Sequence, residues 1–269
     1  STRPTNHPQV SLVIPIRDES GNIGPLINEV QEALDTAGFS WELLVINDGS
    51  TDESVHEVSS ISEKSSRIHL IHLSEGRGKS AALSKGFANV HGEAVVMLDG
   101  DGQDDPAEIP KMLMRLGIAP DGKEPLPAEA DLVNGWKTPR LDPWHKTIPS
   151  CVFNILVSWL TNLSLHDHNC GLKAMRREVA QDLPLGTGMH RFIPVLAASS
   201  GGRVVEQAVH HRPRTQGVSK YGVGRFFRGL FDLVTVWLKL QTGKLSTQIQ
   251  KPVPSTSTTT LRIFLYGLL

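Results

Sequence analysis

The chain of 269 residues is long enough for one large domain or for a domain with an appendage, and a hydrophobic content of 39% supports a substantial core. A formal net charge of -1 argues against a general nucleic-acid binder, because such proteins usually carry an excess of basic residues. The two cysteines, Cys151 and Cys170, match no zinc spacing and make no disulfide framework, so we expect two reduced thiols of a cytoplasmic protein.

The first hundred residues alternate between short apolar runs and amphipathic stretches. The apolar runs, typical of buried strands, cover residues 10–16, 42–46, 68–73 and 94–98. The stretches between them, typical of helices, cover residues 22–37, 52–64 and 78–91. This alternation predicts an α/β fold with a Rossmann-like, mostly parallel sheet and helices on both faces. Sheets of this kind bind ligands at the carboxyl ends of their strands.

The second half is less regular. A mixed helix over residues 143–165 and a strand over 203–209 are expected, and the clearest amphipathic helix covers 221–240. Residues 251–260 have the composition of a linker, and the apolar residues 261–269 are too few to span a membrane. We therefore expect a catalytic domain over residues 1–222, an amphipathic interfacial helix region over 223–245, and a linker with an apolar tail over 246–269.

Polar clusters follow three of the predicted strands, at residues 17–19, 47–50 and 99–105. Asp99 and Asp101 stand two positions apart, so in an extended segment both carboxylates point the same way, and Gln103 continues that face with a neutral oxygen. Such a hard oxygen site suits Mg²⁺ or Mn²⁺ bound together with a diphosphate. A solvated acidic turn is the alternative, and the preceding strand and Pro106 weigh against it.

Two further clusters bear on a nucleotide. Asp48 either belongs to a helix-capping turn or faces a nucleobase from the end of its strand, and both roles are compatible. The run Gly78-Lys79-Ser80 lacks the earlier glycine of a phosphate-binding loop, since Leu73 stands there, and no G-x-G-x-x-G occurs. These absences exclude the NTPase and dinucleotide interpretations. Lys79, near a helix start, can still approach a diphosphate.

A basic segment precedes the amphipathic helix. Arg212, Arg214 and Lys220 place three cations within nine residues, around Gly217. Arginine forks and a lysine suit phosphate, although a solvated basic loop is the alternative. A basic loop beside an apolar helix face favours a lipid phosphate at a membrane surface. Ordinary packing of residues 221–240 on the domain is the competing explanation.

Four motifs in register resemble glycosyltransferase family 2, whose members have the GT-A fold. They are residues 15–22, 47–52, 76–86 and 99–103. Further along, residues 167–173 and 217–221 resemble the polyprenyl-phosphate branch of that family, which includes the dolichol-phosphate mannose synthases. The resemblance implies an inverting, metal-dependent transfer of a sugar from a UDP- or GDP-sugar to dolichyl or undecaprenyl phosphate, at the cytoplasmic face of a membrane.

The resemblance also implies roles for individual residues. It implies that the nucleoside is held by Pro15, Glu19 and Asp48. It implies that the metal and diphosphate are held by Asp99, Asp101 and Gln103. It places Arg214, Ser219 and Lys220 in a loop that closes over the donor and acceptor phosphates. It implies that the acceptor phosphate is contacted by Lys146 and Ser150. The chain departs from the branch at Lys137 and Lys146, where arginine is more frequent, and at Arg17-Asp18 before Glu19.

The acceptor decides which mechanism is needed. A lipid phosphate is already an anionic nucleophile, so the site must neutralise charge and needs no strong base. Asp167 would become a general base if the acceptor were a saccharide hydroxyl, and that alternative stays open. A non-catalytic nucleotide-sugar binding module is a further alternative, against which the intact Asp99-Gly100-Asp101 argues. A nucleotidyltransferase is a third alternative, but this chain lacks the glycine-rich signature expected near the first strand of such an enzyme. The sequence does not specify the sugar, the nucleoside, the lipid or the oligomeric state.

Overall fold

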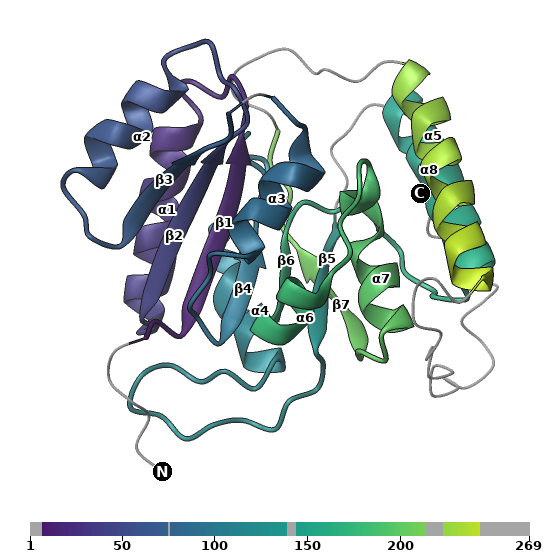
Figure 1. The fold of residues 1–269 in the computed structure, drawn as a ribbon. Helices are drawn as coiled ribbons and strands as arrows, with labels where there is room; N and C mark the ends of the chain where they lie inside the picture. Colours follow the sequence, from purple (N-terminus) through teal and green to yellow (C-terminus); the bar gives the residue numbers. More distant parts are fainter. Residues whose placement is uncertain (1–6, 75, 139–143, 214–222, 243–269) are drawn as a thin grey trace.

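The computed structural model describes residues 7–74, 76–138, 144–213 and 223–242, apart from the side chains of 144–148 and 223–227. Within them a seven-stranded sheet has the order β3-β2-β1-β4-β6-β5-β7 (Figure 1). The strands are β1 (Val10–Ile16), β2 (Trp41–Asn47), β3 (Ile68–His72), β4 (Ala94–Met97), β5 (Leu132–Lys137), β6 (Lys173–Arg176) and β7 (Val204–Val209). Strand β6 runs antiparallel to β4 and β5, and the other neighbouring pairs are parallel. The predicted mostly parallel sheet is confirmed.

Helices cover both faces of this sheet. They are α1 (Ile23–Ala37), α2 (Ser54–Ser62), α3 (Lys79–Phe87), α4 (Ile109–Arg115), α5 (Trp144–Thr161), α6 (Arg177–Asp182), α7 (Ile193–Ser199) and α8 (Val223–Gln241), with short 3-10 turns η1 (Pro106–Glu108) and η2 (Met189–Phe192). Helices α1, α2 and α4 share one apolar cluster with the sheet, and α3, α6 and α7 share the other. The predicted two-sided arrangement is therefore confirmed.

The alternation of side chains along the strands divides the core between the two faces. On β1, Leu12 and Ile14 join the cluster that contains α1, whereas Val13 joins the cluster that contains α3. All three side chains are fully buried, so truncation of any of them would cost about 2–5 kcal/mol of stability. This double-sided burial explains why β1 reads as a continuous apolar run.

Helices α5 and α8 lie side by side, next to the sheet rather than on it (Figure 1). A third apolar cluster joins them to η2 and α7, and α8 contributes Leu233, Val236 and Leu240 to it. The helix predicted over residues 221–240 is thus present, but its apolar residues divide between two faces. Phe231, Val234 and Leu238 are on the outer face and are exposed. In the described part of the chain, no helix is both long enough and apolar enough to cross a membrane.

Because β1, β2, β4, β5 and β7 run in one direction, their carboxyl ends meet at one edge of the sheet. Strand β6 runs the other way, so the segment that precedes it reaches the same edge. All three predicted polar clusters lie along this edge. The linker and tail predicted from residue 246 onward lie outside the described residues.

Candidate active site

The loops after β1 and β2 are hydrogen-bonded to each other. Asp18, held at a φ of 55°, accepts the backbone N–H of Thr51 at 2.8 Å. The backbone N–H of Glu19 donates to Ser54 Oγ at 2.8 Å. Gly100 packs over the same place, because a Cβ on it would lie 3.0 Å from Ile16 and 3.5 Å from Glu19. The structure therefore brings the first and third polar clusters together, with Pro15 and Glu19 beside the Asp99–Asp101 segment.

Asp48 holds the loop that leads into α3. Its carboxylate is almost fully buried and accepts the backbone N–H of Arg77 at 2.6 Å and that of Gly78 at 2.9 Å. Charge-assisted bonds of this kind fix the loop strongly. The nucleoside contact predicted for Asp48 stays a prediction, and the structure adds a second task, which is to set where α3 begins.

Lys79, the first residue of α3, forms an ion pair with Asp99. Burial alone would raise the pKa of Asp99, but the charge and hydrogen bond of Lys79, with a smaller effect of Lys137, together lower that pKa to about 2. Asp99 is therefore ionised at neutral pH. A carboxylate after β4, a cation and the N-terminus of α3 thus lie together. The carboxylate suits a metal ion, and the cation and the helix N-terminus suit the diphosphate bound with it.

Asp101 and Gln103 are partly buried beside this pair. Asp101 Oδ1 accepts the backbone N–H of Gln103 at 3.2 Å, and the Gln103 side-chain N–H points to Arg212 O at 3.4 Å, which leaves its amide oxygen for a cation. No three acidic, histidine or cysteine side chains converge as a metal site within the described residues. The set fits Mg²⁺ or Mn²⁺, which bind through one or two carboxylates together with substrate phosphates.

Asp104, in the same segment, is a buried carboxylate. Burial raises its pKa to about 6, and the negative charges of Asp99 and Asp101 act in the same direction against the cation of Lys137. The backbone of Gly171 lies against both carboxylates, since a Cβ there would lie 2.8 Å from Asp99 Cγ. Residues 167–173, which resemble the polyprenyl-phosphate branch, therefore contact the segment that carries the candidate metal ligand Asp99.

The start of the basic segment is tied to the same place. Residues Asp104 and His211 form a β-bridge, and the backbone N–H of Arg212 donates to Gln103 O at 2.9 Å. The Arg212 guanidinium pairs with Glu29 at 2.6 Å and Asp105 at 2.7 Å. The guanidinium that was considered for phosphate binding is therefore paired with two carboxylates. Through these ion pairs the Arg212 side chain anchors the segment.

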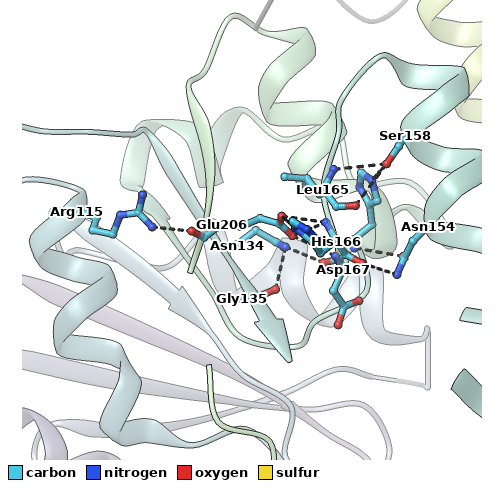
Figure 2. A network of polar contacts seen from close by, with 10 residues as sticks. Arg115, Asn134, Gly135, Asn154, Ser158, Leu165, His166, Asp167 and Glu206 are labelled. Atoms are coloured by element: carbon cyan, nitrogen blue, oxygen red, sulfur yellow. Dashed lines mark hydrogen bonds and ion pairs between the residues drawn. The ribbon is translucent and has the colours of Figure 1, made fainter. Parts of the chain in front are cut away.

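A polar network holds the segment before β6 at this edge (Figure 2). Glu206 of β7 accepts the backbone N–H of His166 at 2.9 Å and its Nδ1 at 2.8 Å. Asn134 of β5 donates to Asp167 O at 2.7 Å, and Asn154 of α5 donates to His166 O at 3.0 Å. The network thus joins α5 to two strands of the sheet, and fixes the segment that carries Asp167.

Asp167 itself is buried. Its Oδ1 accepts the backbone N–H of Asn169 at 3.0 Å, and within the described residues no group donates to its Oδ2. It contributes, with Asp104 and Asp99, to the negative surroundings that raise the pKa of Lys137 in spite of burial. Asp167 is thus one of several negative charges around Lys137, among which Asp104 raises the pKa of Lys137 most.

Several predicted residues are not described. Arg214, Ser219 and Lys220 lie outside the described residues, as does the side chain of Lys146. Conversely, the sequence did not single out His190, Glu206 or Asn154, and it offered Ser80 only as part of the phosphate-loop motif that was excluded. The hydrogen bond from Ser80 to His190 joins residues 110 positions apart, and no local pattern signals such a contact. A polar residue in an otherwise apolar stretch, such as Asn154 in α5, is the one sequence signal that was present.

Comparisons with known proteins bear on the family and on the fold. A sequence model of the glycosyl transferase family 2 matches residues 11–183. A dodecaprenyl-phosphate galacturonate synthase from Rhizobium johnstonii is 36% identical over 242 residues, which are 87% of this chain and 69% of that relative.

Solved structures give the same result for the fold. Glucosyl-3-phosphoglycerate synthase from Mycobacterium tuberculosis, in complex with Mn²⁺, UDP and glucosyl-3-phosphoglycerate, matches with a TM-score of 0.64 and 18% identity, over 86% of this chain and 80% of that chain. Its complex with Mn²⁺ and UDP-glucose matches with a TM-score of 0.64 and 18% identity, over 86% of this chain and 79% of that chain. At this identity the likeness concerns the fold.

Proposed function

Because this chain belongs to glycosyl transferase family 2, we propose that it transfers a sugar from a nucleotide-sugar donor to a polyprenyl phosphate, with inversion at the anomeric carbon. The observation that carries this proposal is the arrangement at the edge of the sheet, where Asp99, Asp101 and Lys79 lie next to the base of a basic segment. The Rhizobium relative, named for a dodecaprenyl-phosphate product, supports the same acceptor class.

On the donor side, Asp99, Asp101 and Gln103 would hold Mg²⁺ or Mn²⁺. When bound, the cation would neutralise the diphosphate as it leaves. Lys79 adds a fixed positive charge at the start of α3, and the buried Asp48 keeps the preceding loop in place. Pro15 and Glu19, next to Gly100, complete the expected nucleoside side of the pocket.

On the acceptor side, a phosphate monoester is already an anion near neutral pH, so the residues must attract it and need not deprotonate it. Lys137, whose pKa is raised by Asp104 ahead of the other surrounding carboxylates, remains charged at any pH of interest. Arg214 and Lys220 would supply further cations from the adjacent segment. The competing acceptor, a saccharide hydroxyl, needs Asp167 as an accessible base, and its burial at 2% exposure weighs against that role.

The membrane surface is the partner that a long-chain lipid phosphate implies. Helices α5 and α8 each expose apolar residues at positions i, i+3 and i+7, which lie on one face of a helix. These residues are Val152, Ile155 and Trp159 on α5, and Phe231, Val234 and Leu238 on α8. Both helices pack on the same inner cluster through other residues, so the exposed residues of each helix lie outside that cluster. We call them the outer apolar face. This face supports peripheral binding at a membrane surface, and we propose that the surface is the cytoplasmic one.

The test is a transfer assay in vesicles that contain polyprenyl phosphate, with a panel of UDP- and GDP-linked hexoses and hexuronates, and with Mn²⁺ or Mg²⁺ against chelator. We expect metal-dependent formation of a lipid-linked sugar from one class of donor. Transfer to soluble saccharides but never to the lipid phosphate would refute the proposed acceptor. Binding of a nucleotide sugar without turnover on any acceptor would favour the non-catalytic module.

A further inference from the structure

The 3-10 turn η2 lies between the donor side of the site and the α5–α8 pair. It contacts α3 on one side and α8 on the other. Two of its residues, Met189 and Phe192, are buried in the third apolar cluster, which fixes the turn. Two polar residues lie between them: His190 contacts α3, and Arg191 contacts α8.

His190 binds the start of α3. Its Nδ1 lies 2.9 Å from Ser80 Oγ, and its backbone N–H donates to the same oxygen at 3.2 Å. Ser80 is buried and directly follows Lys79. Burial lowers the pKa of His190 to about 2, and the neighbouring charge of Lys79 acts in the same direction. The imidazole is therefore neutral and does not repel the ammonium that pairs with Asp99.

Arg191 binds α8. Its Nη1 lies 3.2 Å from Asp232 Oδ2, and both side chains are largely buried, at 18% and 16% exposure. Glycines allow the close approach on both sides of this pair. Gly188 has a φ of 76°, and a Cβ on it would lie 2.7 Å from Asp232 Cγ, while a Cβ on Gly229 would lie 3.5 Å from the Arg191 guanidinium. The backbone of the turn thus lies directly against α8.

We propose that residues 188–192, the bridging turn, hold the lipid-facing helices in register with the donor site. In this arrangement His190 is a positioning residue for Lys79, and Arg191 is a positioning residue for α8. The inference rests on the proposed function, which assigns Lys79 to the diphosphate and α8 to the membrane. Displacing the first turn of α3 withdraws a charge from the donor, whereas displacing α8 moves the lipid phosphate away from the donor.

The donor half is tested by calorimetric titration of the whole chain with UDP and Mn²⁺. His190→Ala and Ser80→Ala should each weaken UDP binding about three- to tenfold, which corresponds to one neutral hydrogen bond. The double variant should be no weaker than either single variant, because both remove the same contact. His190→Asn should restore binding, since its amide places a polar atom where Nδ1 stands. The KM for polyprenyl phosphate should stay unchanged in all of them.

The acceptor half is tested with the double variant Arg191→Gln and Asp232→Asn, which removes both charges and so leaves neither one buried alone. Its KM for polyprenyl phosphate in vesicles should rise severalfold, and its affinity for UDP with Mn²⁺ should not change. The control is Arg67→Gln with Asp35→Asn, which removes an ion pair of 2.7 Å between α1 and the residue that precedes β3. The control should leave both constants unchanged.

The outcomes separate this inference from the proposed function. If the wild-type chain binds neither UDP nor any other nucleoside diphosphate with Mn²⁺, the proposed function fails. If it binds UDP and the His190 and Ser80 variants bind equally well while melting at lower temperature, the turn is only structural and the donor half is overturned. An unchanged KM for the lipid in the Arg191 and Asp232 variant overturns the acceptor half.

Discussion

The outer apolar face of α5 and α8 gives the sharpest prediction. Trp159 is 77% exposed and Phe231 is 73% exposed, so neither is needed to complete the core. Full burial of a side chain of this kind stabilises by about 1.5–3 kcal/mol, and three quarters of that is about 1–2 kcal/mol each. Together they would contribute about 3 kcal/mol on entering a membrane interface. Trp159→Ser with Phe231→Ser should therefore weaken vesicle binding about 100-fold, at about 1.4 kcal/mol for each factor of ten.

The assay is co-sedimentation with anionic vesicles, accompanied by thermal unfolding in buffer. In solution the double variant should melt close to the wild type, because exposed substitutions usually change stability by about 0.5 kcal/mol or less. Trp159→Leu with Phe231→Leu should keep most of the binding. Leu233→Ser, on the buried side of α8, should instead lower stability by several kcal/mol, on the order of 2–5. Undiminished sedimentation of the serine variant, or a melting point as low as that of Leu233→Ser, would refute the reasoning.

Three further predictions concern the sheet edge. Asp101→Asn should reduce transfer by about a hundredfold or more with an unchanged melting temperature, and wild-type rates in chelator would contradict the metal role. Asp48→Ala should weaken UDP binding at least tenfold, because about 1.5–3 kcal/mol is lost with each charged hydrogen bond to the loop, and unaltered calorimetric affinity would contradict it. The hydrogen bond to Glu206 raises the pKa of His166, so it stabilises the fold below the unfolded pKa of about 6.5 and is lost as pH rises through the folded pKa. His166→Gln should therefore lower the melting temperature more at pH 6 than at pH 9, and an equal effect at both would exclude this linkage.

The sequence by itself determined the first half of the fold. Strands β1 to β4 and helices α1 to α3 follow from apolar runs and helical periodicity, which are local properties of the chain. The location of the site followed from them, because parallel strands put their carboxyl ends at one edge. The acidic residues Asp99 and Asp101, and the cation Lys79, were recognised as candidates for the same reason.

Only the tertiary structure decided how the second half closes the site. Strand β6 has four residues, and its antiparallel insertion between β4 and β5 depends on partners distant in sequence. The sequence pattern did not predict this antiparallel strand, since the register and direction of a strand are set by its pairing rather than by its composition. The same insertion brings Gly171 against Asp99 and buries Asp167.

The tertiary structure also decided which polar groups are free to act. The sequence offered Asp48 and Arg212 as ligand-binding groups, and folding adds backbone N–H groups as partners of the first and two carboxylates as partners of the second. Likewise, α8 has one apolar face buried and another exposed, although its sequence predicts a single stripe. Residue types and spacing determine what a side chain could bind, whereas hydrogen bonds between residues far apart in the chain determine what it does bind, because each buried donor or acceptor must find its partner in the folded protein.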